Sequence, residues 1–226
     1  MSESLAFQLR DQGKKYLRQG RPTDAAASYG RALELWHSLA RDANSKRNLS
    51  IGLNDLAGAL HAAGRSGEAL DCYQESLELL DQLLDSDPGN EELLGAQAIT
   101  FLWAATACIE MKHWDEALDT ANGAVAVFSK LAENNPADGR IQFHLALALQ
   151  RRAIAMAETG AAIRGTASTL GTSVLPPPQA ISDAETSRRI LRDLVAKDPA
   201  NSAWANGLAV AELLRERLWP RGQRQR

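Results

Sequence analysis

Apolar residues recur at helical spacing through most of the chain, on one side of each predicted helix. Counted from Ala69, apolar or small residues at offsets 0, 1, 4, 7, 8, 11, 14 and 15 trace a single face of an α-helix. The same offsets hold from Ala25 and from Ala117, while charged and amide side chains occupy the opposite faces. A helix with one apolar stripe cannot bury that stripe alone, so the pattern predicts helices stacked on neighbouring helices.

The apolar pattern repeats along the chain. Three segments align without gaps: GRPTDAAASYGRAL (20–33), GRSGEALDCYQESL (64–77) and KHWDEALDTANGAV (112–125). Their alanines Ala25, Ala69 and Ala117 are 44 and 48 residues apart. The motifs DSDPGN, NNPADG and KDPANS place a proline after the second helix of repeats two, three and four. Proline prevents those helices from continuing. The sequence therefore predicts a repeated pair of helices.

Four helix pairs and one final helix account for nearly the whole chain. The predicted repeats are 5–44, 48–88, 91–136 and 141–199, and their first helices lie near 5–18, 48–62, 91–110 and 141–158. Residues 202–218 have the pattern of the first helix of a further pair. We interpret this helix as a cap over the open end of the stack. We predict an all-α fold, an α-solenoid of stacked antiparallel helix pairs, in a single domain over residues 1–219.

Glycine and proline mark the expected ends of these helices. Glycines that suit a left-handed cap stand just past three of the first helices, at Gly20, Gly64 and Gly160. Lys112 takes that place in the third repeat and breaks the pattern. Residues 160–179 are rich in Gly, Ser, Thr and Pro and are interpreted as a flexible insertion or as a docking segment. The basic tail 220–226 is predicted to fray.

The composition is that of an ordinary globular protein. The chain has 226 residues, of which 45% are apolar and 23% charged, which excludes wholesale disorder. Aromatic residues make up only 5%, which argues against a β-sandwich or barrel. The two cysteines cannot form a disulfide scaffold, and neither a secretory signal nor a membrane-spanning apolar run is found. We therefore expect a cytoplasmic protein without a membrane partner.

Charge is distributed unevenly along the chain. The net charge is −3, so there is no global basic field for nucleic acid and no nucleic-acid partner is expected. Residues 1–139 contain 12 basic and 21 acidic residues, whereas residues 140–226 contain 13 basic and 7 acidic residues. The acidic part either consists of solvated helix faces or guides docking with a partner or with another copy of the chain.

A search for catalytic and metal-binding patterns yields no candidate. The histidines His37, His61, His113 and His144 are isolated, and no HxxxH or CxxC spacing occurs. Cys72 and Cys108 fall on helix faces and are interpreted as packing residues. No glycine-rich phosphate loop follows a predicted strand, and no carboxylate stands out as a general acid or base. We therefore predict no enzyme activity, no metal and no cofactor.

The helix pairs resemble tetratricopeptide repeats. The motif of that family combines a small residue, an aromatic and a glycine turn with Ala, an aromatic and Ala in the second helix. Repeats one and two carry it as Gly13, Tyr16, Gly20, Ala25, Tyr29 and Ala32, and as Ala57, Leu60, Gly64, Ala69, Tyr73 and Ser76. The usual period is about 34 residues, and the longer period here resembles a subgroup common in bacterial proteins. The resemblance implies a right-handed stack whose concave groove binds another protein.

A basic stripe follows the first helix at i, i+4 and i+8, formed by Arg10, Lys14 and Arg18. The resemblance places this face in the concave groove, where some family members clamp a partner's C-terminal carboxylate with basic residues and asparagines. Arg10 and Lys14 fit such a clamp. Asp55 stands where the clamp asparagine is expected, and Asn54 lies one position away. The stripe is open to a second interpretation as a solvated helix face.

An apolar stripe continues the same face in repeat three and leads into repeat four. It consists of Ile99, Leu102, Trp103, Thr106 and Ile109, followed by Leu147, Gln150, Arg151 and Ile154. Ile99 and Trp103 replace the basic residues of the clamp, which is therefore incomplete. Either this face is packed in the core or it awaits a ligand. The candidate groove residues are Arg10, Lys14, Arg18, Asn54, Ile99, Leu102, Trp103, Ile109 and Arg151.

Two functional hypotheses follow from these observations. The first is a protein-interaction module, a scaffold or adaptor whose groove binds a peptide or helix of another protein. The alternative is a structural module that associates with itself through complementary acidic and basic surfaces. An enzyme is a third class, for which the sequence offers no residues.

Overall fold

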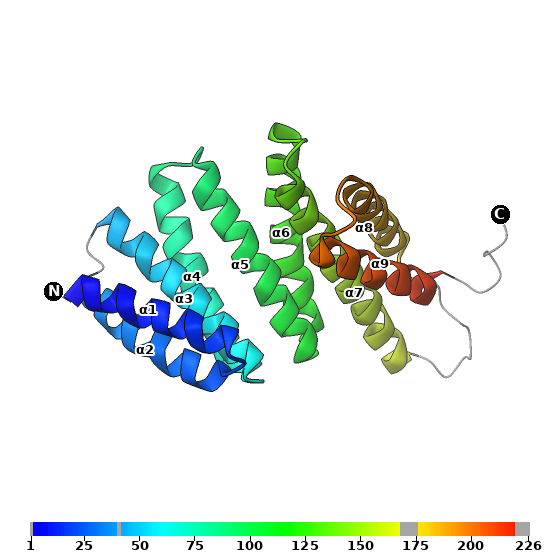
Figure 1. Cartoon of the computed structure of the whole chain (residues 1–226). Helices are drawn as coiled ribbons and strands as arrows, with labels where there is room; N and C mark the ends of the chain where they lie inside the picture. Colours follow the sequence, from blue (N-terminus) through cyan, green and yellow to red (C-terminus); the bar gives the residue numbers. More distant parts are fainter. Residues whose placement is uncertain (1, 40–41, 168–175, 220–226) are drawn as a thin grey trace. The chain divides into compact units, whose positions relative to one another are not determined.

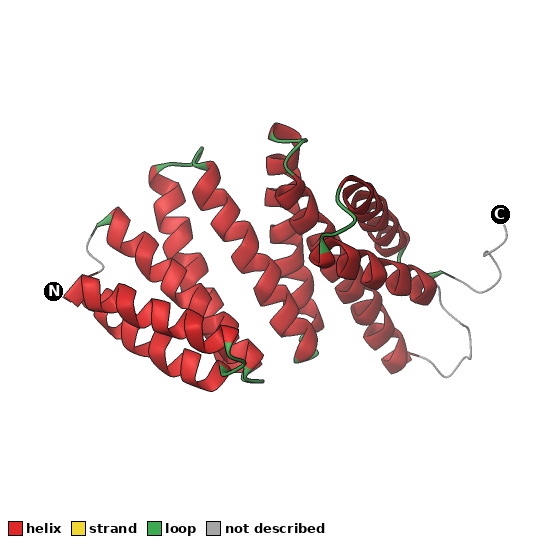
Figure 2. Cartoon of the chain, in the orientation of Figure 1, coloured by secondary structure: helices red, strands yellow, loops and turns green. Residues whose placement is uncertain are grey.

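The computed structural model describes residues 2–39, 42–167 and 176–219. These residues form nine α-helices and no strand (Figure 2). Within each of two compact units, consecutive helices run antiparallel and pack against each other (Figure 1). The predicted fold class, an all-α stack of antiparallel helix pairs, is confirmed.

The first compact unit spans Met1–Met111. It contains five helices: α1 (Ser2–Arg18), α2 (Pro22–Leu39), α3 (Ala43–Ala62), α4 (Ser66–Ser86) and α5 (Glu91–Glu110). Each helix packs against the next one along the chain. The boundaries agree with the predicted first helices of repeats one to three to within a few residues.

The second compact unit spans Lys112–Arg226. Its helices are α6 (Trp114–Asn134), α7 (Gly139–Ala167), α8 (Pro178–Lys197) and α9 (Ser202–Leu218). Successive helices pack together, and α9 also contacts α7. The third predicted repeat contributes α5 to the first unit and α6 to the second, and a single domain over 1–219 stays a prediction.

The proline motifs between repeats supply the caps of the following helices. Asn90 accepts hydrogen bonds from the backbone amides of Glu92 and Leu93, and Asn201 accepts one from the amide of Trp204. Asp138 does the same for Arg140 at the start of α7. Each cap satisfies amides that the first turn of a helix leaves without a partner. The proline thus ends one helix, and the residue two positions later starts the next.

Left-handed backbone ends three of the first helices. Gly20 and Gly64 adopt φ angles of 69° and 77°, as the sequence predicts. Lys112 adopts φ 60° at the equivalent place, so the turn is kept without glycine. The expectation for Gly160 was wrong, because α7 continues through it to Ala167. Of the predicted insertion 160–179, residues 168–175 lie outside the described residues.

Small residues let the helices of the first unit approach closely. Gly13 of α1 lies against the ring of Tyr29, and Gly52 of α3 lies against the ring of Trp36. A methyl group at either glycine would come within 2.6 Å of a ring carbon. The motif alanine Ala69 is fully buried, as is its counterpart Ala117 in the second unit. The register predicted from the apolar pattern is therefore the register of the fold.

Two helices differ from the expected distribution of apolar side chains. On α9, the predicted cap, Val210 and Leu213 are 43% and 66% exposed, so its outer face is not uniformly polar. Among the described residues α5 is apolar and long enough to cross a membrane, but 44% of its most apolar window is buried within the fold. Core helices of soluble proteins meet the same criterion, so this is weak evidence for a membrane span.

Candidate protein-binding surfaces

Asn54 lies at a junction of three helices in the first unit. Its Nδ2 donates to Ser76 Oγ of α4 at 3.1 Å and to Thr100 Oγ1 of α5 at 2.9 Å. The Ser76 hydroxyl donates in turn to the Ser50 carbonyl at 3.2 Å. Because its amide group is engaged in joining helices, Asn54 is not free to bind a partner's carboxylate.

The basic stripe of α1 is not uniform. Arg10 pairs with Asp55 of α3 at 2.5 Å, and both side chains are partly buried. Lys14 lies 3.8 Å from Asp11, one turn away on the same helix, and is more exposed. Arg18 is exposed. The residue found where the clamp asparagine was expected thus neutralises Arg10, leaving Lys14 and Arg18 as the more available cations.

The apolar face of α5 is partly core and partly surface. Leu102 is only 1% exposed and belongs to the core. Ile99 and Ile109 are half-buried. Trp103 is 41% exposed, which is unusual for so large an apolar side chain. Of the four apolar candidates on this helix, Trp103 therefore has the most exposed side chain.

Charged pairs tie the first helices of the repeats to one another in the first unit. Arg47 of α3 pairs with Glu92 of α5, and His61 of α3 lies 3.2 Å from Glu110 of α5. Together with Arg10–Asp55 they link α1, α3 and α5 in order. We call the surface formed by Lys14, Arg18 and Trp103 on these linked helices the odd-helix face. Arg151, the remaining candidate, is half-buried on α7 in the second unit.

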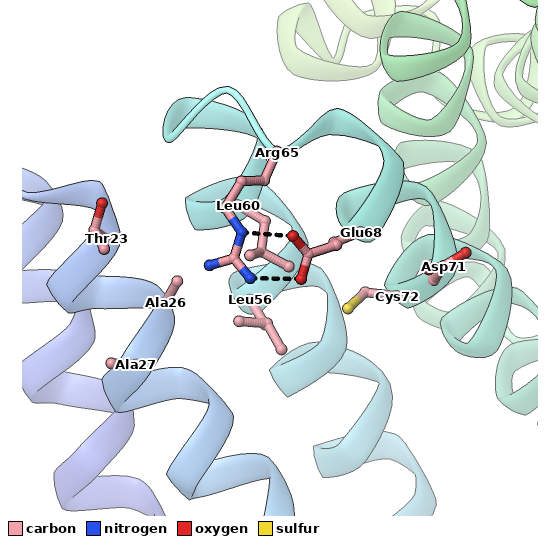
Figure 3. Close-up of a pocket in the computed structure, with 9 residues that line it drawn as sticks. All are labelled: Thr23, Ala26, Ala27, Leu56, Leu60, Arg65, Glu68, Asp71 and Cys72. Atoms are coloured by element: carbon pink, nitrogen blue, oxygen red, sulfur yellow. Dashed lines mark hydrogen bonds and ion pairs between the residues drawn. The ribbon is translucent and has the colours of Figure 1, made fainter. Parts of the chain in front are cut away.

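A furrow lies between α2 and α4, with α3 as its floor (Figure 3). Its volume is about 490 Å³, within the range of ligand-binding clefts. Nine residues line it: Thr23, Ala26, Ala27, Leu56, Leu60, Arg65, Glu68, Asp71 and Cys72. All nine belong to the first unit, and none was a candidate from the sequence.

The furrow combines an apolar floor with a charged rim. Leu56 and Leu60 form the floor. Arg65 makes two hydrogen bonds to Glu68, at 2.6 and 2.5 Å, which raise the pKa of the guanidinium and lower the pKa of the carboxyl. Burial raises the pKa of Cys72 to about 11, with nearby carboxylates adding to the effect, so its thiol stays protonated at neutral pH.

One sequence signal could have located the furrow. The second helix of repeat one reads AAAS over 25–28, where repeat two has ALDC over 69–72. The wall formed by α2 therefore lacks the bulk that Leu70 and Cys72 supply at the equivalent places of α4. A run of small residues beside a larger homologous set indicates space between helices, but only the packed structure shows whether another side chain fills it.

The histidines contact carboxylates or aromatic rings. His37 lies 3.3 Å from Glu75, and His113, the residue before α6, lies 3.3 Å from Glu116 in that helix. The ring of His144 stacks on Phe128 at 5.5 Å, and burial lowers the pKa of His144. Within the described part of the chain no three His, Cys, Asp or Glu side chains are placed to hold a metal ion.

Residues 10–82 match the family model of the tetratricopeptide repeat. Residues 10–82 thus belong to the tetratricopeptide repeat family. The matched segment runs from α1 into α4 and contains the motif residues Gly13, Tyr29 and Ala69. Tetratricopeptide repeats generally serve as scaffolds for protein–protein interaction. No curated protein matches the sequence.

Two solved structures with TM-scores above 0.5 share the fold over nearly the whole chain. One contains the nearly identical TPR-like repeats of a Podosopora anserina protein described as a kinesin light chain, with 16% identity, TM-score 0.53 and coverage of 100% of this chain and 99% of that one. A variant of that protein has 15% identity and a TM-score of 0.53, and the match covers 96% of this chain and 97% of that one. BtubC from P. vanneervenii has 17% identity and a TM-score of 0.49, and the match covers 96% of this chain and 79% of that one. At such identities the likeness to the two Podosopora anserina structures shows the fold alone.

Proposed function

We propose that this protein is a non-enzymatic adaptor that binds a peptide or helix of another protein on its odd-helix face. The observation that carries the proposal is the 41% exposure of Trp103 on α5. Tryptophan is enriched among the residues that dominate binding energy at protein interfaces, and its ring loses water contact when a partner covers it. Single exposed apolar residues are common on protein surfaces, so binding has to be measured directly.

The charges of α1 complement an apolar anchor on α5. Lys14 and Arg18 remain on the surface after Arg10 is neutralised by Asp55. Exposed charges of this kind accelerate the encounter with an oppositely charged partner more than they strengthen the final complex. The proposed partner segment therefore carries an apolar anchor for Trp103 and an acidic stretch for α1.

Affinity capture from the native cell, followed by mass spectrometry, supplies the partner for a direct test. We expect Trp103→Ala to weaken the captured complex by about 2 kcal/mol or more, close to thirtyfold in Kd, without a change in melting temperature. Leu213→Ala is the matched control, because Leu213 is also exposed but lies on α9. Full affinity of a folded Trp103→Ala protein would reject the odd-helix face as the binding surface.

The α1 charges have a separate kinetic test. Lys14→Glu with Arg18→Glu should slow association, and the effect should grow as the salt concentration falls. Lys15→Glu with Gln19→Glu serves as the control, since both residues are exposed on another face of the same segment. Equal association rates for the two double variants would remove α1 from the site.

Self-association is the second candidate function. The observation in its favour is the charge of the two units, because Met1–Met111 contains 10 basic and 16 acidic residues and Lys112–Arg226 contains 15 and 12. Complementary units of two copies would attract each other most strongly at low salt. Light scattering at low and high salt distinguishes the candidates, since a dimer that dissociates with added salt supports self-association.

A further inference from the structure

The furrow between α2 and α4 is built to receive an apolar side chain. Leu56 and Leu60 of α3 form its floor, and the α2 wall is made of the short side chains of Ala26 and Ala27 (Figure 3). An apolar group placed on this floor would remove leucine surface from water, which is favourable in proportion to the area covered. The floor alone is consistent with many occupants, so the charge of the rim decides which one fits.

The rim of the furrow on α4 is acidic. Residues 66–86 contain six acidic residues and neither Lys nor Arg. Arg65, just before the helix, is held by Glu68 through two hydrogen bonds and does not offset the rest of the helix. Asp71, one turn after Glu68, lines the furrow and is exposed, and it makes no ion pair with the part of the chain that the structure describes. Its charge is available to an incoming cation.

The same charge pattern continues beyond the furrow. Glu75, one turn after Asp71, reaches His37 of α2 at 3.3 Å, so that pair bridges α2 and α4 beyond the residues that line the furrow. Glu78 continues the exposed acidic positions of α4 past Glu75. A segment lying along the furrow would meet carboxylates on the α4 side and small, uncharged side chains where α2 lines it. An anionic segment would be repelled by these carboxylates.

We propose that the furrow binds a cationic peptide segment of another protein, with an apolar side chain on Leu56 and Leu60 and a Lys or Arg against Asp71. The apolar floor supplies affinity and the acidic rim supplies selectivity for charge. This site is lined by α2, α3 and α4 of the first unit and uses no residue of the odd-helix face. It therefore stands whether or not the odd-helix face binds a partner.

Selection from a phage library of short random peptides against the immobilised full chain tests the charge rule. Selected peptides should be enriched in Lys or Arg next to Leu, Ile, Met or Phe and depleted in Asp and Glu. The strongest peptide, labelled with fluorescein, then gives a Kd by anisotropy. Replacing its cations by Glu, or its apolar residue by Ser, should each weaken binding about tenfold. Absence of cationic enrichment would overturn the proposal.

Two variants of α4 locate the binding site of that peptide. Asp71→Arg should weaken it about tenfold, because a rim carboxylate becomes a repelling cation. Asp85→Arg changes the net charge equally on the same helix but lies about 21 Å further along it, beyond the screening length at physiological salt. It should leave Kd unchanged. Equal effects of the two substitutions would reduce the interaction to general attraction by an acidic protein and would reject the furrow.

Cys72 provides a readout that needs no substitution. Its thiol lines the furrow and is half-buried, whereas Cys108 is fully buried and serves as the internal control. Alkylation of Cys72 by N-ethylmaleimide at mildly alkaline pH should slow several-fold in the presence of saturating peptide. Unchanged alkylation with bound peptide would place the peptide elsewhere. Ala27→Trp, at an exposed position of the furrow wall, should block binding without unfolding the chain.

Two further measurements separate this site from the other surfaces. Trp103→Ala should leave the affinity for the cationic peptide unchanged, and a loss there would assign the peptide to the odd-helix face. Sedimentation without peptide should show the same oligomeric state for the original chain and for Asp71→Arg. A dimer that Asp71→Arg dissociates would make a second copy of the chain the occupant of the furrow and would overturn the proposal.

Discussion

The two units join three successive helices at the same repeat position but with different side chains. Asn54 stands three residues before Ala57, and Gln150 stands three residues before Ala153. Asn54 links α3 to Ser76 of α4 and to α5. Gln150 links α7 to α8 and α9, because its Nε2 donates to Ser187 Oγ and to the Gly207 carbonyl, both at 3.1 Å.

The difference lies in how completely each amide is satisfied. Asn54 is half-buried, and its Nδ2 donates to two hydroxyl groups. Gln150 is fully buried, and its Oε1 accepts no hydrogen bond within the described structure. A buried acceptor without a partner costs free energy that the two donated bonds must offset. The repeat position thus requires a side chain that reaches two neighbouring helices, but it does not fix how well that side chain is paired.

The largest expected effect tests whether the units open separately. Ala69→Asp in α4 and Ala117→Asp in α6 each bury an unpaired carboxylate at a fully buried site and should cost several kcal/mol. Hydrogen exchange should show opening confined to the unit that carries the substitution. Gln74→Asp and Ala126→Asp, at exposed positions of the same helices, are the controls and should leave stability nearly unchanged.

Simultaneous loss of protection in both units would show that they unfold as one cooperative body. The comparison between Asn54 and Gln150 would then describe two parts of one core rather than two units. An unchanged melting temperature for Ala69→Asp would contradict the repeat register itself.

The register was predictable because it depends on local pattern. Ala25, Ala69 and Ala117 recur with the apolar stripe, and a helix must bury that stripe whatever its neighbours are. The extent of α7 was not predictable from Gly160, since a glycine inside a helix costs only about 1 kcal/mol and can be tolerated where the rest of the helix is stable. The sequence placed Lys112 at the position that glycine takes after the first helix of other repeats, but it did not predict that Lys112 adopts the left-handed backbone itself.

The candidate site was less predictable because it depends on partners distant in sequence. The orientation of Asn54 is set by Thr100, and the charge of Arg10 is neutralised by Asp55, each more than forty residues away. The furrow exists because α2 contributes alanines where α4 contributes larger residues. Sequence patterns indicate which face of a helix is apolar, but space between helices is a property of the packed structure.

The second prediction compares a tight glycine contact in each unit. A Cβ at Gly52 would lie 2.6 Å from the buried ring of Trp36, so Gly52→Ala should cost about 1–3 kcal/mol. A Cβ at Gly139, the first residue of α7, would lie 3.1 Å from the half-buried ring of Trp204, which has room to shift. Gly139→Ala should therefore be neutral or slightly stabilising. Chemical denaturation measures both, and equal costs would contradict the difference in packing.

The third prediction addresses the two amides directly. Asn54→Leu removes hydrogen bonds from a satisfied junction and should cost about 1 kcal/mol. Gln150→Met keeps the length of the side chain and removes the unpaired Oε1 along with two donated bonds, so it should change stability by less than about 0.5 kcal/mol. Denaturation midpoints at constant m-value provide the measurement. A larger loss for Gln150→Met would show that Oε1 is paired in solution and that the two junctions are equivalent.

The smallest expected effect compares the carboxylate caps of the two units across acidic pH. Asp42 starts α3 and accepts from the backbone amide and hydroxyl of Ser45, at 2.8 and 2.7 Å, and the amide is the larger cause of its lowered pKa. Asp138 starts α7, and the backbone amide of Arg140 at 2.8 Å is the main cause of its lowered pKa.

A carboxyl whose pKa is lower in the folded chain stabilises the fold above its unfolded pKa, near 3.8, and loses that contribution as the pH falls through the folded value. Both variants, Asp42→Asn and Asp138→Asn, should therefore melt slightly below the original chain at pH 7, since asparagine still caps a helix. The gap should close as the pH falls through the lowered folded pKa values of the two carboxyls. A gap that persists in acid for only one variant would show that the caps of the two units act through different interactions.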